Sequence, residues 1–180
     1  MRDSSQSKIY VGLGSNLGDR AGYLLLAVRG MLDAGLRITR LSSVYETAPV
    51  GVLSAQPLFL NMVAELVCDA AAPSPEQLLA RLLRIEYSLG RRREELLAAR
   101  TIDLDLLLYG DMRSETEFLT LPHPRLHLRR FVLVPLAQLA PDALHPTLGE
   151  SFKLLLSGLS DDSQVVRWPA SSGSGALSDS

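Results

Sequence analysis

One short segment, from Arg100 to Tyr109, constrains the fold and the chemistry of this chain more than any other. Its sequence, RTIDLDLLLY, alternates polar and apolar residues in the manner of a β-strand. Side chains two apart in a strand point to the same face, so Asp103 and Asp105 should project side by side, with apolar neighbours on the other face. Two parallel carboxylates suit a hard cation such as Mg²⁺ and a phosphate chain bound to it. The alternative interpretation is a solvated strand face that carries two acids.

The length and composition predict one globular domain. With 180 residues, 47% hydrophobic and 21% charged, the chain can bury a core and is not a disordered composition. We expect a single domain over residues 1–160 and a flexible C-terminal tail over 161–180, because the end of the chain is rich in serine and glycine. The net charge of −2 gives no overall attraction to nucleic acid or to membranes.

The cysteine content and the first residues bear on the cellular compartment. The single cysteine, Cys68, excludes an intramolecular disulfide framework and is compatible with a reducing compartment. Residues 1–7 lack the apolar core of a signal peptide, and no apolar run approaches the roughly 20 residues of a membrane span. We therefore expect a cytoplasmic protein.

Residue patterns predict six main elements. They are a strand over 9–13, a helix over 17–34, strands over 36–47 and 60–67, a helix over 75–89 and a strand over 100–109. Asn16 and Ser74 are the expected N-caps of the two helices, and Gly90 follows the end of the second. A further helical turn or two, broken around Pro135, is expected over 129–139. The order β-α-β-β-α-β predicts an α+β fold with a ferredoxin-like core, in which helices pack on an antiparallel sheet.

A glycine-rich segment, GLGSNLGD over 12–19, joins the first predicted strand to the first helix. It differs from a dinucleotide-binding loop in spacing and in the elements that follow, and it lacks the Gly-Lys-Ser/Thr of a P-loop. The favoured interpretation is a tight strand-to-helix turn that Asn16 caps.

Two neighbouring segments, SSVYETAPVG over 42–51 and QPLFLN over 56–61, carry features of a site for a flat heterocycle. An aromatic side chain can stack on the ring, while an asparagine and free main-chain groups pair with its polar edge. The alternative is an ordinary connection between two strands, with Phe59 in the core.

Arginines gather just before the strand that carries the two aspartates. They are Arg81, Arg84, Arg91, Arg92, Arg93 and Arg100. An arginine loop beside a metal site can neutralise the charge that develops during transfer from a nucleoside triphosphate. The alternative is a solvated basic face.

The proline-fixed segment LPHPRLHLRRF, over 121–131, can present His123 and Arg129 to a phosphate chain. A zinc site is not favoured there, because the flanking prolines oppose the helix that would align His123 with His127.

Together these segments resemble the 6-hydroxymethyl-7,8-dihydropterin pyrophosphokinase family of folate biosynthesis. The resemblance covers roughly residues 9–148 and rests on GLGSNLGD, SSVYETAPVG, QPLFLN, RIEYSLGRRR, RTIDLDLLLYGD and LPHPRLHLRRFVLVPLAQLAP, in that order. The most diagnostic motifs are RTIDLDLLLYGD and LPHPRLHLRRF. The family's fold implies an α-β-α sandwich on the ferredoxin-like core.

The resemblance implies a transferase that moves pyrophosphate from ATP to the pterin hydroxymethyl group and releases AMP, with two Mg²⁺ ions accompanying ATP. The metal ligands would be Asp103 and Asp105, and the catalytic set would be Arg91, Arg100 and Asp105. Contacts with ATP are implied for Glu86, Arg93, Leu106, Thr120, His123 and Arg129, as well as for Arg91 and Arg100. The pterin pocket would comprise Thr47, Pro49, Val50, Gly51, Phe59, Asn61 and Phe131. The ring would lie between Phe59 and Phe131, with Asn61 at its polar edge.

The expected partners are therefore ATP and the reduced pterin, with no nucleic acid or membrane. A monomer is expected, and contact with other folate-pathway enzymes is left open.

The chain departs from the family pattern mainly in the arginine loop. Where members often carry Arg-Trp-Gly-Pro, this chain has Leu-Leu-Ala-Ala over 96–99, in a loop one residue shorter. Phe59, Leu83 and Leu128 replace a tyrosine, a glutamine and a polar residue that are usual in the family. These departures concern loop closure and nucleotide affinity more than the chemistry. They leave a catalytically weakened member as one alternative. A ferredoxin-like RNA-binding module is the other, although the sheet lacks an aromatic-rich strand and the net charge is negative.

Overall fold

The computed structural model describes residues 8–51, 55–92 and 98–168, and it contains one main antiparallel sheet. The strands run in the spatial order β5-β1-β4-β3-β8, and β2 pairs with another part of β4. The strands of this sheet are β1 (Lys8–Ser15), β2 (Ile38–Leu41), β3 (Tyr45–Thr47), β4 (Phe59–Val67), β5 (Asp103–Tyr109) and β8 (Val165–Arg167). Because β2 and β3 both pair with β4, they together occupy the strand position next to it.

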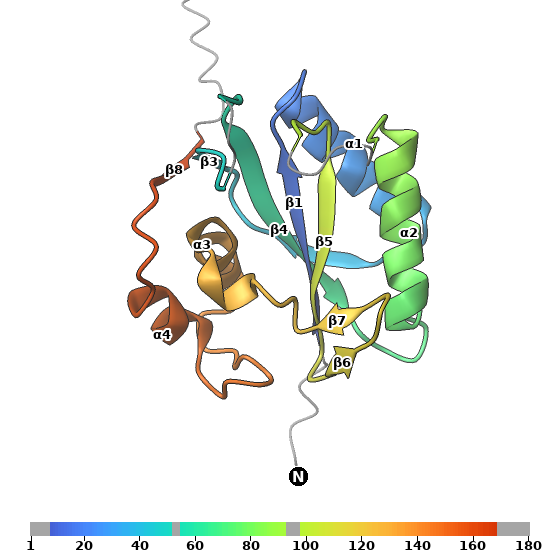
Figure 1. The fold of residues 1–180 in the computed structure, drawn as a ribbon. Helices are drawn as coiled ribbons and strands as arrows, with labels where there is room; N and C mark the ends of the chain where they lie inside the picture. The colour runs from blue at the N-terminus through green and yellow to red at the C-terminus, as the bar shows by residue number, and fades with distance from the viewer. Residues whose placement is uncertain (1–7, 52–54, 93–97, 169–180) are drawn as a thin grey trace, which may run out of the picture.

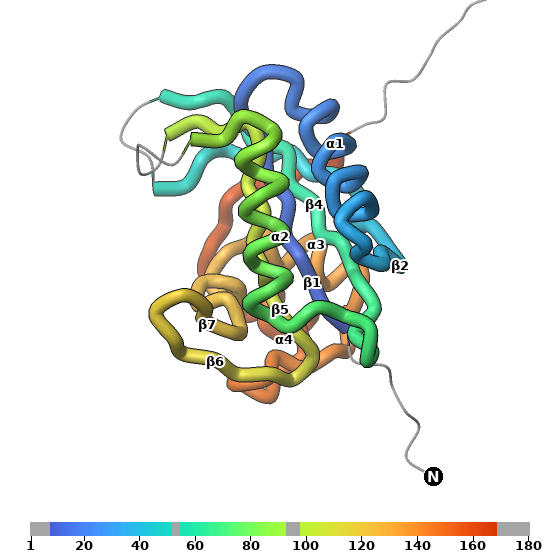
Figure 2. Tube along the Cα trace, turned by 90° about the vertical axis from the view of Figure 1, so that its right-hand side faces the viewer, coloured from blue at the N-terminus to red at the C-terminus, as the bar shows by residue number. Residues whose placement is uncertain are grey.

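Helices cover both sides of this sheet (Figure 1). On one side lie α1 (Arg20–Asp33) and α2 (Pro75–Ser88), which run side by side in both views (Figure 2). On the other side lie α3 (Arg130–Leu139) and α4 (Phe152–Ser157), with the short 3-10 helix η1 (Leu126–Leu128) before them. This arrangement confirms the predicted ferredoxin-like core in an α-β-α sandwich.

The alternation of side chains along β1 and β5 divides the core in two. Odd-numbered residues of β1, such as Val11 and Leu13, pack with α1 and α2, whereas Tyr10 packs with α3 and α4. In β5, Leu104 and Leu106 join the first of these clusters. Asp103 and Asp105 face the other side of the sheet, as the spacing predicted, so the candidate site lies on the face that α3 covers.

Helix α2 follows its sequence signals closely. Ser74 and Gln77 form a reciprocal capping box, Pro75 stands in the first turn, and Gly90 has a φ of 86° just beyond the helix. The predicted caps are confirmed, and the helix presents Leu78 and Leu82 to the core.

Helix α1 begins later than predicted. Its N-cap is Asp19, whose side chain accepts a hydrogen bond from the Gly22 amide at 2.9 Å, and not Asn16. Gly18 has a φ of 68°, in the left-handed region, so the right-handed helix cannot extend back through it. Asn16 is buried and serves other contacts. The segment over 12–19 does join the first strand to the first helix, as predicted, but β1 extends through Ser15 and the predicted cap by Asn16 was wrong.

Two predicted strands are shorter in the structure. The segment expected over 36–47 divides into β2 and β3 at Ser42, whose main-chain N–H and side chain both bond to Val63 of β4. The strand expected from Arg100 begins at Asp103, because both main-chain groups of Arg100 bond to Asn16 and Leu17.

Several smaller elements also differ from the prediction. Helix α3 runs unbroken through Pro135, since proline removes only one N–H from the ladder. The hairpin of β6 (Ser114–Glu115) and β7 (Thr120–Leu121), and helix α4, were not predicted.

The predicted start of a flexible tail at residue 161 also differs from the structure. Asp161 accepts a hydrogen bond from the Arg130 amide at 2.9 Å, and β8 pairs with β3. Trp168 packs against the core and donates its main-chain N–H to Val44 at 2.9 Å. Residues 169–180 lie outside the described part of the chain. No helix within the described ranges is long and apolar enough to cross a membrane.

Candidate active site

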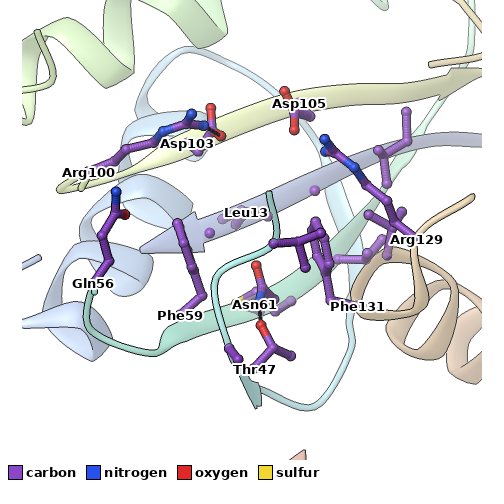
Figure 3. A pocket seen from close by; sticks show the side chains of 18 of the residues that line it. Leu13, Thr47, Gln56, Phe59, Asn61, Arg100, Asp103, Asp105, Arg129 and Phe131 are labelled. Atoms are coloured by element: carbon purple, nitrogen blue, oxygen red, sulfur yellow. Dashed lines mark hydrogen bonds and ion pairs between the residues drawn. The ribbon is translucent and has the colours of Figure 1, made fainter. Parts of the chain in front are cut away.

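An open pocket lies between the sheet and the start of α3, with about 830 Å³ of empty space that is continuous with solvent. Figure 3 shows the side chains that converge on it from β4, β5, α3 and the loop before β4. The lining residues are Gly12, Leu13, Gly14, Thr47, Ala48, Val50, Gln56, Phe59, Asn61, Met62, Val63, Ala98, Arg100, Asp103, Asp105, Leu107, Arg129, Phe131 and Val132.

Two glycines of β1 make room for this pocket. Gly12 and Gly14 lie in the strand on the face that carries the pocket. A Cβ atom on Gly14 would lie 3.0 Å from Asn61 Oδ1 and 3.7 Å from Phe59. The missing side chain at Gly14 therefore keeps the space beside Asn61 and Phe59 open.

The apolar half of the pocket is a slot between two aromatic rings. Phe59 comes from β4 and Phe131 from α3, and Asn61 lies between them in Figure 3. Asn61 is 7% exposed, and its Nδ2 donates to Thr47 Oγ1 at 2.7 Å. This bond fixes the amide, with its Oδ1 left to meet a ligand. A flat heterocycle with polar edges suits such a slot.

The polar half of the pocket carries the two aspartates of β5 and nearby arginines. Asp103 forms ion pairs with Arg91 and Arg100. Burial alone would raise the pKa of Asp103, yet the charges of these two arginines hold it below its ordinary value. Asp103 is therefore ionised at neutral pH.

Asp105 has a different environment. Burial, together with the neighbouring charges of Asp103 and Glu86, raises its pKa to about 7, although the charges of Arg129 and Arg91 act to lower it. Among the described residues, none forms a hydrogen bond or an ion pair with the side chain of Asp105, whose main chain pairs with β1. Two acids that crowd each other in this way are stabilised by a cation between them.

The donor set fits a hard divalent cation. Asp103 and Asp105 offer carboxylate oxygens side by side on one face of β5. Within the part of the chain that the structure describes, no group of three or more His, Cys, Asp or Glu side chains could hold a metal. A metal with only two protein ligands keeps waters and binds substrate phosphates, which is how proteins usually hold Mg²⁺.

Glu86 supports this half of the pocket from beneath. It is 1% exposed, and its Oε1 accepts from the Leu104 amide at 2.7 Å and from Arg91 Nη1 at 3.0 Å. Glu86 thus ties the end of α2 to β5 and fixes Arg91 against Asp103.

Arg129 and His123 border the pocket on the side of α3. Arg129 lines the pocket, with its guanidinium 5.5 Å from the centre of the Phe131 ring and near Asp105 in Figure 3. His123 donates its main-chain N–H to Leu107 at 2.9 Å, and burial, with Arg129 and Arg125, lowers its pKa to about 4. His123 is therefore neutral at pH 7.

The structure brings nine of the predicted site residues to the pocket wall. They are Thr47, Val50, Phe59, Asn61, Arg100, Asp103, Asp105, Arg129 and Phe131. Others lie outside the wall: Glu86 and Arg91 behind Asp103, His123 beside Leu107, and Pro49 and Gly51 in the loop after β3.

Three further predictions need separate comment. The Leu106 side chain points into the core beneath α1 and α2, so a side-chain contact with ATP is not possible in this structure. Thr120 is exposed on β7 and does not line the pocket. Arg93 lies outside the described residues.

Sequence reasoning missed the roles of Gln56, Asn16 and Gly14. Gln56 lines the pocket, and the Asn16 side chain donates a hydrogen bond to Gln56. The sequence segment GLGSN could have indicated this role for Gly14, because glycines that alternate along a strand mark a face with space for a ligand.

Comparison with known proteins identifies the family. Residues 10–141 match the model of 7,8-dihydro-6-hydroxymethylpterin-pyrophosphokinase, abbreviated HPPK. The chain belongs to the HPPK family. A Bacillus subtilis HPPK, named 2-amino-4-hydroxy-6-hydroxymethyldihydropteridine pyrophosphokinase, is 46% identical over 131 residues, which are 72% of this chain and 76% of that one. The enzyme of the same name from Synechocystis is 40% identical over 164 residues, covering 91% and 80% of the two chains.

Other relatives carry the HPPK domain within longer proteins. A mitochondrial folate synthesis bifunctional protein of Arabidopsis thaliana is 40% identical over 141 residues, which are 78% of this chain and 25% of that protein. A crystal structure of Plasmodium falciparum HPPK-DHPS superposes with a TM-score of 0.65 at 15% identity, covering 87% of this chain and 46% of that one. This second likeness concerns the fold, and it agrees with the sandwich described above.

Proposed function

We infer that this chain transfers pyrophosphate from ATP to 6-hydroxymethyl-7,8-dihydropterin, releasing AMP. The observation that carries the inference is a single pocket that joins an aromatic slot to a pair of carboxylates flanked by arginines. Membership of the HPPK family supports the same reaction, because several relatives bear the name of that pyrophosphokinase. We refer below to the aromatic slot as the pterin half and to the carboxylate end as the phosphate half.

The pterin half would hold the ring between Phe59 and Phe131. Asn61 is already fixed by its bond to Thr47, so its free Oδ1 can accept from the heterocycle without reorganisation. The hydroxymethyl group at the edge of the ring would then extend toward Asp105 and Arg129, which lie at the far side of the pocket in Figure 3.

The phosphate half would hold ATP with Mg²⁺ on Asp103 and Asp105. Bound there, Mg²⁺ would neutralise charge on the phosphate chain. Arg91 and Glu86 hold Asp103 in place, while Arg100 and Arg129 lie at the pocket wall. We propose that Arg100 exchanges its ion pair with Asp103 for phosphate oxygens when ATP binds, and that Arg129 binds the same phosphate chain.

Transfer requires one bond to form and one to break. The hydroxymethyl oxygen bonds to the β-phosphorus and loses its proton to solvent, and the bond from that phosphorus to the α–β bridging oxygen breaks, so AMP leaves with the bridging oxygen. Fixed arginines can stabilise the charge that spreads over the transferred group, because they are held in position before the reaction.

A product assay tests this function directly. The protein is incubated with ATP, Mg²⁺ and the reduced pterin, and the products are separated by chromatography. We expect equal amounts of AMP and pterin diphosphate, with no ADP, and no AMP when pterin is omitted or EDTA is added. ADP in place of AMP, or no reaction, would refute the proposal.

The cellular compartment, the oligomeric state and the protein partners are proposals as well. We propose that the protein acts in the cytoplasm as a monomer. Fusion of the HPPK domain in relatives such as the bifunctional protein of Arabidopsis supports contact with other folate-pathway enzymes.

A further inference from the structure

Asn16 occupies a central place among the segments that border the pocket, although it does not line the pocket itself. It is 1% exposed and follows the last residue of β1. Its Oδ1 accepts from the Arg100 amide at 2.7 Å. Its Nδ2 donates to Gln56 Oε1 and to the Pro57 carbonyl, both at 3.2 Å. One buried side chain therefore bonds to two segments that are 40 and 84 residues away in sequence.

On the phosphate half, the contact fixes the main chain of Arg100. The amides of Asn16 and Leu17 both donate to the Arg100 carbonyl at 3.1 Å, so both main-chain groups of Arg100 are bonded to this turn. The Arg100 guanidinium pairs with Asp103 at the pocket wall. The position of a group proposed to bind phosphate thus depends on residues 16 and 17.

On the pterin half, the contact fixes the segment that leads into β4. Gln56 lines the pocket, and Phe59 follows three residues later. Arg20 adds a bond from its Nη1 to the Leu58 carbonyl at 2.8 Å. The segment over 56–58 is therefore held by residues of the β1–α1 junction.

The chemistry of the contact requires a carboxamide. The site offers one N–H, from Arg100, and two carbonyl oxygens, from Gln56 and Pro57. Asparagine matches this pattern, because it has one acceptor oxygen and an NH₂ group with two donors. Aspartate would keep the bond to Arg100 but would place a carboxylate oxygen against two carbonyl oxygens.

We propose that Asn16 is a positioning residue that couples the pterin half of the pocket to the phosphate half. The proposal rests on the function inferred above. A ligand that immobilises either segment also immobilises the Asn16 side chain, which bonds to both segments. The second ligand then loses less conformational entropy when it binds, because the other segment is already held. Each substrate should therefore bind more tightly when the other is present, and the effect should depend on the amide of Asn16.

Calorimetry can measure this coupling without turnover. Mg²⁺ with α,β-methylene-ATP serves as the nucleotide probe, because its carbon bridge cannot be cleaved in the transfer, and 6-hydroxymethyl-7,8-dihydropterin serves as the pterin. The quantity measured is the ratio of the pterin Kd without the nucleotide probe to the Kd with it. We expect a ratio of about five or more in the unchanged protein.

Four variants distinguish coupling from a structural role. Asn16→Ala and Asn16→Asp should bring the ratio below about two, and Gln56→Ala should give an intermediate value. Asp19→Ala removes the N-cap of α1 in the same turn without touching either segment, so it should lower the thermal stability yet keep the ratio. Because Gln56 is a loop residue outside the core, its variant tests the proposal even if Asn16 variants fail to fold.

The outcomes separate this proposal from the proposed function. A ratio near one in the unchanged protein, or an unchanged ratio in the folded Asn16 or Gln56 variants, would overturn the coupling role while leaving the function intact. Equal losses in Asp19→Ala and Asn16→Ala would also overturn it. Failure of the unchanged protein to bind either probe would refute the proposed function itself.

Discussion

Replacing Gly14 by alanine tests whether the empty space beside Asn61 is what admits the pterin. Gly14 does not have a positive φ, so alanine fits the backbone. The new Cβ would lie 3.0 Å from Asn61 Oδ1, which forces the amide to move by a few tenths of an ångström. That movement strains the 2.7 Å bond from Asn61 to Thr47 and displaces the Oδ1 that would meet the ligand. Loss of most of one buried hydrogen bond costs about 1–2 kcal/mol, which corresponds to a roughly 5- to 30-fold weaker pterin Kd.

The matched control is Gly12→Ala, two residues earlier in the same strand. A Cβ there would lie 3.5 Å from the Leu107 side chain, an ordinary contact. Calorimetric titration with the pterin should show a larger loss for Gly14→Ala than for Gly12→Ala, with the Kd of the ATP analogue unchanged in the Gly14 variant. The free energy of unfolding should change by less than about 1 kcal/mol, because alanine costs less conformational entropy than glycine in a strand. Equal pterin losses in both variants, or none in Gly14→Ala, would refute this reasoning.

Three further predictions concern charged groups. Asp105→Ala should lower turnover about 100-fold or more in a steady-state assay. The melting temperature of this variant should stay equal or rise, because the Asp105 carboxylate is disfavoured in the folded state. The control is Asp111→Ala, which changes an exposed aspartate. Arg100→Ala should slow single-turnover transfer about 100-fold in quench-flow, unlike Arg92→Ala, and an unchanged rate would remove Arg100 from the catalytic set. Burial would raise the pKa of Glu65, but hydrogen bonds from Arg40 and Thr39 lower it to about 2. The ionised Glu65 side chain therefore stabilises the folded state above pH 4.5, and this contribution is lost as the pH falls toward 2. Denaturant titrations should show this loss, about 3 kcal/mol, in the unchanged protein and not in Glu65→Gln.

Local patterns in the sequence predicted those parts of the fold that depend on neighbouring residues. Alternation along β5 placed Asp103 and Asp105 on one face, and Ser74 with Gln77 marked the start of α2. Both features arise from side-chain direction and hydrogen bonds within a few residues. The element order then gave the ferredoxin-like core, because few topologies accommodate it.

Contacts between distant segments could not be predicted in the same way. Asn16 has the chemistry of a helix cap, and only the approach of residues 56, 57 and 100 shows that its amide is used elsewhere. Likewise, Glu86 has no local signal that it is buried against the Leu104 amide. The positions of Phe59, Phe131 and Arg129 around one pocket depend on three separate elements, so the site as a whole came from the family resemblance and not from spacing alone.

The pairing of β8 with β3 has a consequence for handling the protein. The main chain of an uncovered strand at the edge of a sheet can pair with another molecule, and such edges promote aggregation. In this protein, residues 165–167 occupy the outer side of β3, next to Thr47. A chain shortened to residue 160 would make β3 the edge strand in place of β8, so pairing with another molecule at high concentration would engage β3 itself. Intermolecular pairing would then begin beside the candidate pocket, where a loss of binding could be mistaken for a catalytic defect.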